Sequence, residues 1–211
     1  DAIDMAEKTS RQEISAIHTG IAGQHIKTMS HQAMSYRNNP QDEISQEELD
    51  KLNQEMVKVA LPLGEQILHV LPQEYTIDDQ TNIMDPIGMC GSKLQCNYQI
   101  ISGQTAATNN INRSFEKAGL QIESIRLNSL SSAESVLSHE EKEAGVVLID
   151  MGGGTTDISI YQEGILRYTS SIPIGSAIIT KDIKAGCTVT HDQAEKLKVR
   201  FGSAWPGENK D

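Results

Sequence analysis

The feature that most constrains the fold of this chain is a glycine-rich turn, DMGGGTTD, at residues 150–157. It follows an unbroken apolar run, 145–149, of the kind that predicts a strand buried on both faces. It precedes two alternating segments, 156–161 and 165–172, joined at Glu163-Gly164 as a hairpin. Three consecutive glycines let a backbone turn tightly and bring its N–H groups against an anion. The pattern therefore predicts a phosphate-binding turn, with a plain glycine-rich hairpin as the alternative.

The polar residues beside these glycines predict separate roles in such a site. Thr155 and Thr156 supply hydroxyl donors in addition to the backbone N–H groups. A carboxylate repels phosphate, so we expect Asp150 to hold a hydrated Mg²⁺ beside it. No GK[ST] follows, so the motif is not a P-loop. A strand rather than a helix comes next, so it is not a Rossmann fingerprint either.

The rest of the chain alternates predicted strands and helices, which favours an α/β fold. Two capping boxes mark helix starts, Ser45 with Glu48 and Thr190 with Gln193, and Gly186 is placed to end a helix. We expect helices at 45–61, 105–118, 131–137, 175–185 and 192–201, strands at 13–17, 20–26, 66–71, 74–77, 92–102 and 122–127, and a loop at 81–89.

Composition disfavours several functions. The 211 residues carry a formal net charge of −11, which makes nucleic acid an unsuitable partner. No stretch approaches the roughly 20 apolar residues that a membrane helix needs. Cys90, Cys96 and Cys187 have no CxxC spacing, which argues against a disulfide framework and against a zinc site. No GxSxG elbow indicates a serine hydrolase.

The strand, Asp-x-Gly-Gly-Gly-Thr-x-Asp and following strand resemble the second phosphate loop of the actin/Hsp70-type ATPase superfamily. Within it, four further stretches resemble the FtsA family of bacterial cell-division proteins: LHVLPQEY, DPIGM, GIAGQHI and AEKLKVRFG, at 68–75, 85–89, 20–26 and 194–202. The resemblance spans nearly the whole chain. It implies an α/β, actin-like ATPase (ribonuclease H-like) fold, seen here as an internal fragment of about half the protein.

The same resemblance implies an order of subdomains. An α+β insert of the SHS2 type, called 1C, would occupy 24–103. Residues 1–23 and 104–147 would form part of subdomain 1A. Residues 148–187 would form part of 2A with the second phosphate loop, and 188–211 would begin 2B.

Carried over residue by residue, the resemblance implies a site for ATP and Mg²⁺. The phosphates would bind Gly152, Gly153, Gly154, Thr155 and Thr156. Asp150 would orient Mg²⁺ through water, and Asp157 would support the loop or the metal shell. Glu195 and Lys198 lie three apart on one helical face and would reach the ribose and adenine; the alternative for them is a surface ion pair.

Hydrolysis is less well specified than binding. A first phosphate loop and an adenine loop are not in this sequence, so we expect ATP binding to be weak or absent here. Family members position a water near the segment aligned with 128–137. Asn128 and Ser129 are the nearest positions, and Glu134 lies about a turn and a half further on. We assign no catalytic residue and expect at most a weak ATPase.

The function implied is a scaffold that tethers the FtsZ ring to the cytoplasmic face of the bacterial inner membrane at midcell. Its partners would be FtsZ, other copies of itself and, through the insert, later division proteins. Membrane attachment would use a C-terminal helix absent here. Other actin-superfamily members stay open, such as a PilM-like pilus assembly protein or a sugar kinase, and so does a pure protein-interaction module.

Overall fold

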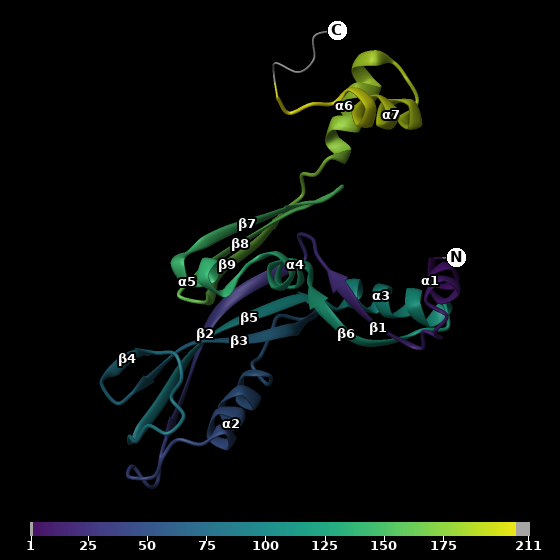
Figure 1. Ribbon diagram of the computed structural model, residues 1–211. Coiled ribbons are helices and arrows are strands. Elements are labelled where there is room, and N and C mark those ends of the chain that lie inside the picture. The colour runs from purple at the N-terminus through teal and green to yellow at the C-terminus, as the bar shows by residue number, and fades with distance from the viewer. Residues whose placement is uncertain (1, 206–211) are drawn as a thin grey trace.

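The computed structural model describes residues 2–205, which form three β-sheets and seven helices (Figure 1). The predicted ranges 1–23 and 188–211 therefore extend to residues outside the described part. The elements are α1 (Ala2–Ser10), β1 (Ala16–Ile21), β2 (Ile26–Tyr36), α2 (Gln46–Met56), β3 (Glu65–Ile77), β4 (Gln80–Ile83), β5 (Lys93–Gln104), α3 (Thr105–Lys117), β6 (Gln121–Leu127), α4 (Asn128–Val136), α5 (His139–Ala144), β7 (Val146–Met151), β8 (Thr156–Gln162), β9 (Ile165–Ile172), α6 (Ala177–Cys187) and α7 (His191–Phe201).

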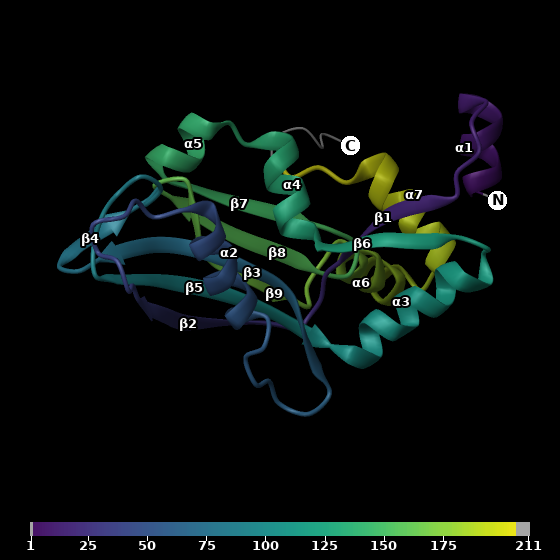
Figure 2. The ribbon, with the colours of Figure 1, turned by 90° about the horizontal axis from the view of Figure 1, so that it is seen from below.

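The sheets show how one unit interrupts another. β1 and β6 pair in parallel, although about a hundred residues separate them in sequence. The intervening strands form their own antiparallel sheet, in the order β2-β5-β3-β4, which we call the insert sheet. The third sheet, β7-β8-β9, is an antiparallel meander. Figures 1 and 2 show the meander lying along the insert sheet, and β9 contacts both β2 and β3.

One face of the insert sheet is covered by α2. Leu49, Leu52 and Met56 recur at helical spacing and are buried against Cys96 and Tyr98 of the central strand β5. The Ser45–Glu48 capping box is present at the start of α2, as predicted. The helix ends at Met56, earlier than the predicted 61, and Val59 still packs on the same core.

The other face of the insert sheet meets the meander in a second core. Ile101 of β5 packs with Leu127 at the end of β6, Ala133 of α4, and Tyr161 and Leu166 of the hairpin β8–β9. All five side chains are buried. This core joins the insert sheet to the strands that flank the glycine turn.

The prediction that residues 145–149 form a strand buried on both faces is wrong. β7 alternates, and Val147 and Ile149 are 54% and 57% exposed. The reason is that only the face bearing Val146 and Leu148 packs on a core, while the opposite face, which bears Val147 and Ile149, is exposed. The run of apolar residues therefore predicted the strand correctly, but it did not predict how much of each face is buried.

Other boundaries differ from prediction for local reasons. Residues 66–71 and 74–77 form one strand, because Pro72 is accommodated by a register shift between Pro72 and Tyr75. The predicted loop 81–89 begins with the end of β4, which pairs with β3. Helix α6 runs through Gly186 to Cys187 and stops at Thr188, whose φ is +53°.

Two further differences concern which elements exist. Helix α5 was not predicted. The sequence predicted strands at 13–17 and 20–26, where the structure has a single strand, β1, followed by the start of β2.

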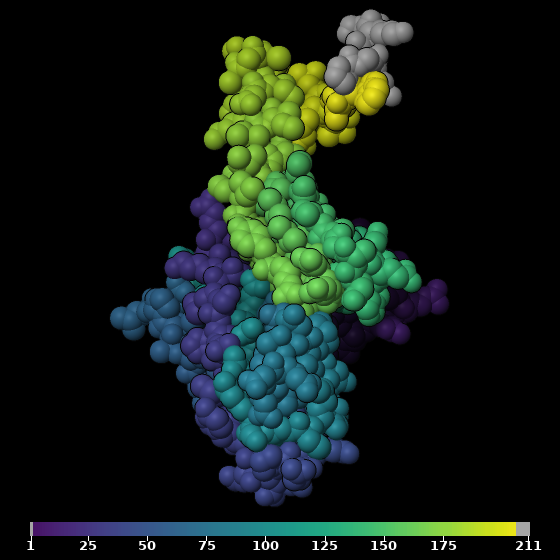
Figure 3. Space-filling view, turned by 90° about the vertical axis from the view of Figure 1, so that its left-hand side faces the viewer, coloured from purple at the N-terminus to yellow at the C-terminus, as the bar shows by residue number. Residues whose placement is uncertain are grey.

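Helices α6 and α7 pack on each other and project from the meander (Figures 1 and 3). The Thr190–Gln193 capping box begins α7, as predicted: the Gln193 N–H donates to Thr190 Oγ1 at 3.4 Å and the Thr190 N–H donates to Gln193 Oε1 at 3.0 Å. Among the described residues, no helix combines the length and apolar character needed to span a membrane.

Candidate functional site

The glycine turn connects β7 to β8 and is closed by a hydrogen bond from the Gly152 N–H to the Thr155 carbonyl at 2.8 Å. Its carbonyls face α6. The Ser176 N–H donates to Gly152 O at 3.0 Å, and the Ala177 N–H donates to Gly153 O at 2.9 Å. The turn therefore caps the first N–H groups of α6, which satisfies donors that a helix start leaves unpaired.

This capping fixes where the N–H groups of the turn point. In a trans peptide the carbonyl and the following N–H point in opposite directions. Because Gly152 O and Gly153 O face α6, the N–H groups of Gly153 and Gly154 face away from it. Within residues 2–205 neither N–H has a hydrogen-bond acceptor, and both glycines are exposed. Two adjacent N–H donors on an exposed turn are therefore available to an anion.

The glycines of the turn leave open space at its surface, and none of them is required by a left-handed backbone conformation. None of Gly152, Gly153 and Gly154 has a positive φ. A Cβ added at Gly153 or Gly154 would meet no atom within 4 Å, so these positions leave an open cradle that a side chain would fill. Gly175 is different, because a Cβ there would lie 2.5 Å from Gly153 O and 2.6 Å from Gly152 O. Gly175 therefore permits the close contact between the turn and α6. The sequence did not predict this role.

The two threonines differ in their availability to a ligand. Thr156 is buried and its hydroxyl donates to the Ile174 carbonyl at 2.7 Å, so it ties the turn to the segment before α6. Thr155 is half-buried, and its carbonyl closes the turn. Among the described residues, the Thr155 hydroxyl has no hydrogen-bond partner. Of the two predicted hydroxyl donors, it is therefore the one available to a ligand.

Asp150 and Asp157 lie directly opposite each other on β7 and β8. Opposite residues of an antiparallel pair share a face, so the two carboxylates flank the base of the turn on one side of the meander. The Ser132 hydroxyl of α4 donates to Asp150 Oδ2 at 2.6 Å. Asp157 is 7% exposed. Two carboxylates are the kind of oxygen ligand that binds a Mg²⁺ ion which keeps most of its waters; the predicted role of Asp150 and Asp157 at such an ion stays a prediction. No cluster of three His, Cys, Asp or Glu side chains suited to a metal occurs in the described part of the chain.

Asp150 also lines a cleft of about 320 Å³ between the ends of β1 and β6 and the start of α4. Asn128 lies in this cleft, close against β1: a Cβ at Gly20 would sit 1.9 Å from its Oδ1. Ser129 is buried and hydrogen-bonds to Thr169 at 3.2 Å. Glu134 lies on the exposed side of α4 and pairs with Lys142 at 3.2 Å. Asn128 is thus the one of these three predicted positions that lines the cleft with Asp150.

Glu195 and Lys198 pair with each other, with Lys198 Nζ 2.8 Å from Glu195 Oε2. The buried Thr180 of α6 donates to Glu195 at 2.6 Å and accepts from Lys198 at 3.0 Å. The Lys198 and Thr180 hydrogen bonds hold the pKa of Glu195 below its usual range. Lys198 also reaches the Ser176 carbonyl at 3.5 Å, at the residue whose N–H contacts the turn. The pair is therefore linked to the turn through the first residues of α6.

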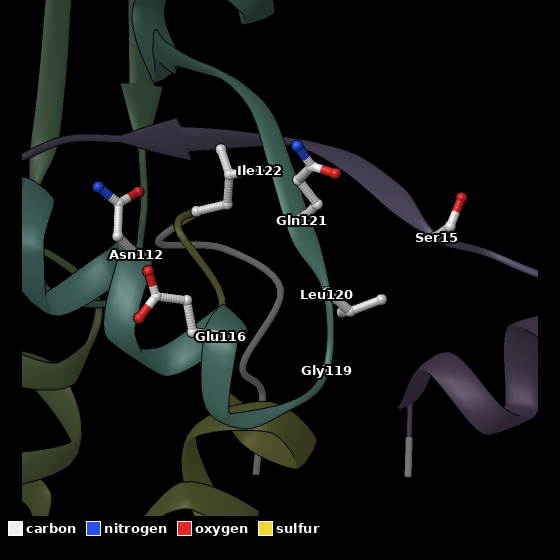
Figure 4. Close-up of a pocket in the computed structure, with 7 residues that line it drawn as sticks. All are labelled: Ser15, Asn112, Glu116, Gly119, Leu120, Gln121 and Ile122. Atoms are coloured by element: carbon white, nitrogen blue, oxygen red, sulfur yellow. The ribbon is translucent and has the colours of Figure 1, made fainter.

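The site also uses residues that the sequence did not indicate. Ser132 and Gly175 contact Asp150 and the turn respectively. A lone serine within a predicted helix and a glycine before one carry no local signal of such contacts. A separate open pocket lies where α3 turns into β6, with Asn112 and Glu116 on one side and Gln121 on the other (Figure 4). It contains no predicted site residue.

Comparisons with known proteins agree with this architecture. The family model described as "SHS2 domain inserted in FTSA" matches residues 23–102, and the one described as "Cell division protein FtsA" matches residues 147–211. The chain is 36% identical over 203 residues to a cell division protein FtsA of Neisseria meningitidis and 36% identical over 204 residues to one of Pseudomonas aeruginosa. Each alignment covers 96% of this chain, and 49% and 48% of the relative, so the chain spans about half the length of these proteins.

A solved structure described as a PilM-PilN type IV pilus biogenesis complex has a similar fold. It matches with a TM-score of 0.66 and 12% identity, over 95% of this chain and 56% of that chain. At this identity the likeness concerns the fold alone. The α/β architecture, with an SHS2-type insert in an actin-like framework, agrees with the prediction.

Proposed function

Because the chain belongs to the FtsA family of cell-division proteins, we propose that it is the part of a division scaffold that carries the insert and a nucleotide-binding turn. The proposed ligand is ATP with Mg²⁺. The observation that carries this proposal is the pair of unpaired N–H groups at Gly153 and Gly154, in a turn with open room around both. Two carboxylates at the base of the turn support a hydrated metal ion beside the phosphates.

We assign residues to this site by what each can reach. Gly153, Gly154 and Thr155 would hold the phosphates. Gly152, predicted from the sequence as a phosphate ligand, would instead close the turn, because its N–H donates to the Thr155 carbonyl, and Thr156 would hold the turn in place. Asp150 and Asp157 would orient Mg²⁺ through water. Glu195 and Lys198 would face the sugar and base. The Glu195 carboxylate accepts a hydrogen bond from the buried Thr180 hydroxyl and pairs with Lys198. A contact between Glu195 and a nucleotide would therefore replace one of these two interactions.

Hydrolysis by this part of the scaffold would be slow at most. The cleft beside Asp150 is lined by Asn128, Ser131 and Ser132, none of which is a base of the strength that carboxylates supply. His18 also lines it, but both nitrogens of its imidazole face Ser124 and Glu123. The carboxylate of Glu134 is engaged by Lys142 away from the cleft. The nucleotide would then serve assembly rather than turnover.

The wider role follows from family membership. We propose that the whole protein tethers FtsZ filaments to the cytoplasmic face of the inner membrane, self-associates, and recruits later division proteins through the insert. The second candidate is a pure protein-interaction module. The insert sheet with its own helix-covered core is the observation that favours it.

Nuclear magnetic resonance separates the two candidates. Adding Mg-ATP to the ¹⁵N-labelled chain should shift the N–H resonances of Gly153 and Gly154, while Gly119 and Gly164, which lie in other turns, stay in place. Asp150→Asn should remove the part of the response that depends on Mg²⁺. Shifts spread evenly over all glycines, or none at Gly153 and Gly154 at millimolar ATP, would leave only the interaction module.

A further inference from the structure

The stretch His69–Tyr75, which marks the family resemblance, lies in the middle of β3 between two irregularities. The pairing of β3 with β5 shifts between Ile67 and His69 and again between Pro72 and Tyr75. Each bulge reverses which residues face which side of the sheet, since side chains alternate along a strand. The segment between the bulges therefore has the opposite phase to the strand on either side.

The packing of the β3 side chains is consistent with this reversal of the two faces. Ile67, Val70, Tyr75 and Ile77 all pack on the core under α2, although their numbers change from odd to even and back. Leu71 packs instead on the second core, with α4 and the β8–β9 hairpin. Without the bulges, residues 69 and 71 would point toward α2 rather than toward the nucleotide-binding half. The two bulges thus aim this one segment at the rest of the molecule.

The first polar contact of the segment is made by His69. Its Nε2 accepts a hydrogen bond from the Leu127 N–H at 3.0 Å. Leu127 ends β6 and immediately precedes α4, which carries Asn128 in the cleft and Ser132 on Asp150. The imidazole of the insert sheet therefore holds the start of the helix that contacts the metal-orienting carboxylate.

The second polar contact is made by Glu74. Its Oε2 accepts from the Arg167 guanidinium of β9 at 3.2 Å, while its Oε1 accepts from Asn97 of β5 at 3.4 Å. Arg167 also pairs with Glu163 in the β8–β9 turn. Strand β9 pairs along its length with β8, which begins at the glycine turn. The Glu74–Arg167 pair is partly exposed, so it contributes orientation more than stability.

We infer that the segment His69–Tyr75 couples the insert sheet to the glycine turn, with His69 and Glu74 as positioning residues. It acts through two routes, one along β6 and α4 to Asp150 and one along β9 and β8 to Thr156. This inference gives a regulatory role to the proposed nucleotide site and rests on that proposal. A partner that shifts the insert would change the geometry of the turn, and a ligand at the turn would change the insert by the same coupling free energy.

Amide hydrogen exchange on the whole chain without nucleotide tests the coupling. The reporters are the Leu127 N–H, and the three N–H groups that fix the turn: Gly152, Ser176 and Ala177. His69→Ala should raise exchange at Leu127 about fivefold, which corresponds to one neutral hydrogen bond, and should also raise it at the three turn reporters. His69→Gln, whose amide oxygen can accept the same bond, should restore values close to those of the unsubstituted chain.

Glu74→Gln tests the second route and should raise exchange at the same turn reporters. Its matched control is Glu134→Gln, which breaks the Glu134–Lys142 ion pair on the exposed side of α4 and should leave the turn reporters unchanged. The coupling is refuted if neither His69→Ala nor Glu74→Gln moves the turn reporters, or if Glu134→Gln moves them equally. Absence of Mg-ATP binding in a parallel titration would refute the nucleotide site without altering the exchange result.

Discussion

At the scale of single residues, the side chains that matter most are those that join distant segments. Arg37 is one example: its side chain is 5% exposed, and it binds Glu48 at 2.8 Å and the carbonyls of Asp42 and Gly91 at 2.9 and 3.1 Å. The sequence predicted the Ser45–Glu48 capping box but not this use of Glu48 by an arginine eleven residues earlier. Contacts of this kind depend on the fold and have no local pattern.

Replacing Arg37 should therefore destabilise the insert sheet. Arg37→Ala removes the guanidinium that donates to the Glu48 carboxylate and to three carbonyls, those of Asp42, Glu43 and Gly91, so we expect the free energy of unfolding to fall by about 3 kcal/mol. Urea unfolding followed by circular dichroism measures it. Arg113→Ala, an exposed arginine on α3, should change it by less than about 0.5 kcal/mol. Equal effects of the two substitutions would contradict the assigned role of Arg37.

His69 should make stability depend on pH. Burial, followed by the charge of Arg126, lowers its pKa below the usual 6.5. The unfolded chain then binds the proton more readily than the folded one, so His69 contributes its full stability above about pH 6.5 and loses it as pH falls toward the folded-state pKa. The difference in unfolding free energy between the original chain and His69→Gln should shrink or reverse between pH 7.5 and 5.5. A difference that is constant with pH would contradict this.

At the scale of elements, the sequence predicted the existence of most strands and helices, because capping boxes and apolar periodicity are local. It failed where the environment decides. Residues 146–149 lie in the predicted strand, but the exposure of Val147 and Ile149 depends on whether another element covers their face of the meander. The sequence predicted two strands separated at Pro72. The structure has one strand with a bulge there, because β3 stays paired with β5 before and after the irregularity.

The contact between the turn and α6 gives a prediction at this scale. Gly175→Ala places a Cβ about 2.5 Å from Gly153 O, so the start of α6 must move and lose its bonds from Ser176 and Ala177. Gly153→Ala meets open space and should leave both bonds intact. We expect faster amide exchange at Ser176 and Ala177 in Gly175→Ala alone. The reverse order would show that the turn and α6 are not held as described.

At the scale of the whole molecule, the insert sheet, the β1–β6 pair and the meander meet around the second core, with the glycine turn on one side and His69–Tyr75 on the other. The turn was predictable, since three glycines between two strands form a local pattern. Its capping of α6, the cleft with Asn128 and the hydrogen bonds of Thr180 to Glu195 and Lys198 were not, because they join segments that only folding brings together.

The central claim is that residues 150–157 form a phosphate-binding turn, and a calorimetric titration of Mg-ATP tests it most directly. The titration is made on this chain and on a chimera in which the 211 residues replace the matched half of the Neisseria meningitidis relative. We predict binding to the chimera, weaker binding to the chain alone, and loss of binding in the chimera with Gly153→Asp, which adds a negative charge where the phosphates would lie. Equal binding with and without Gly153→Asp, or no binding to the chimera, would contradict the claim.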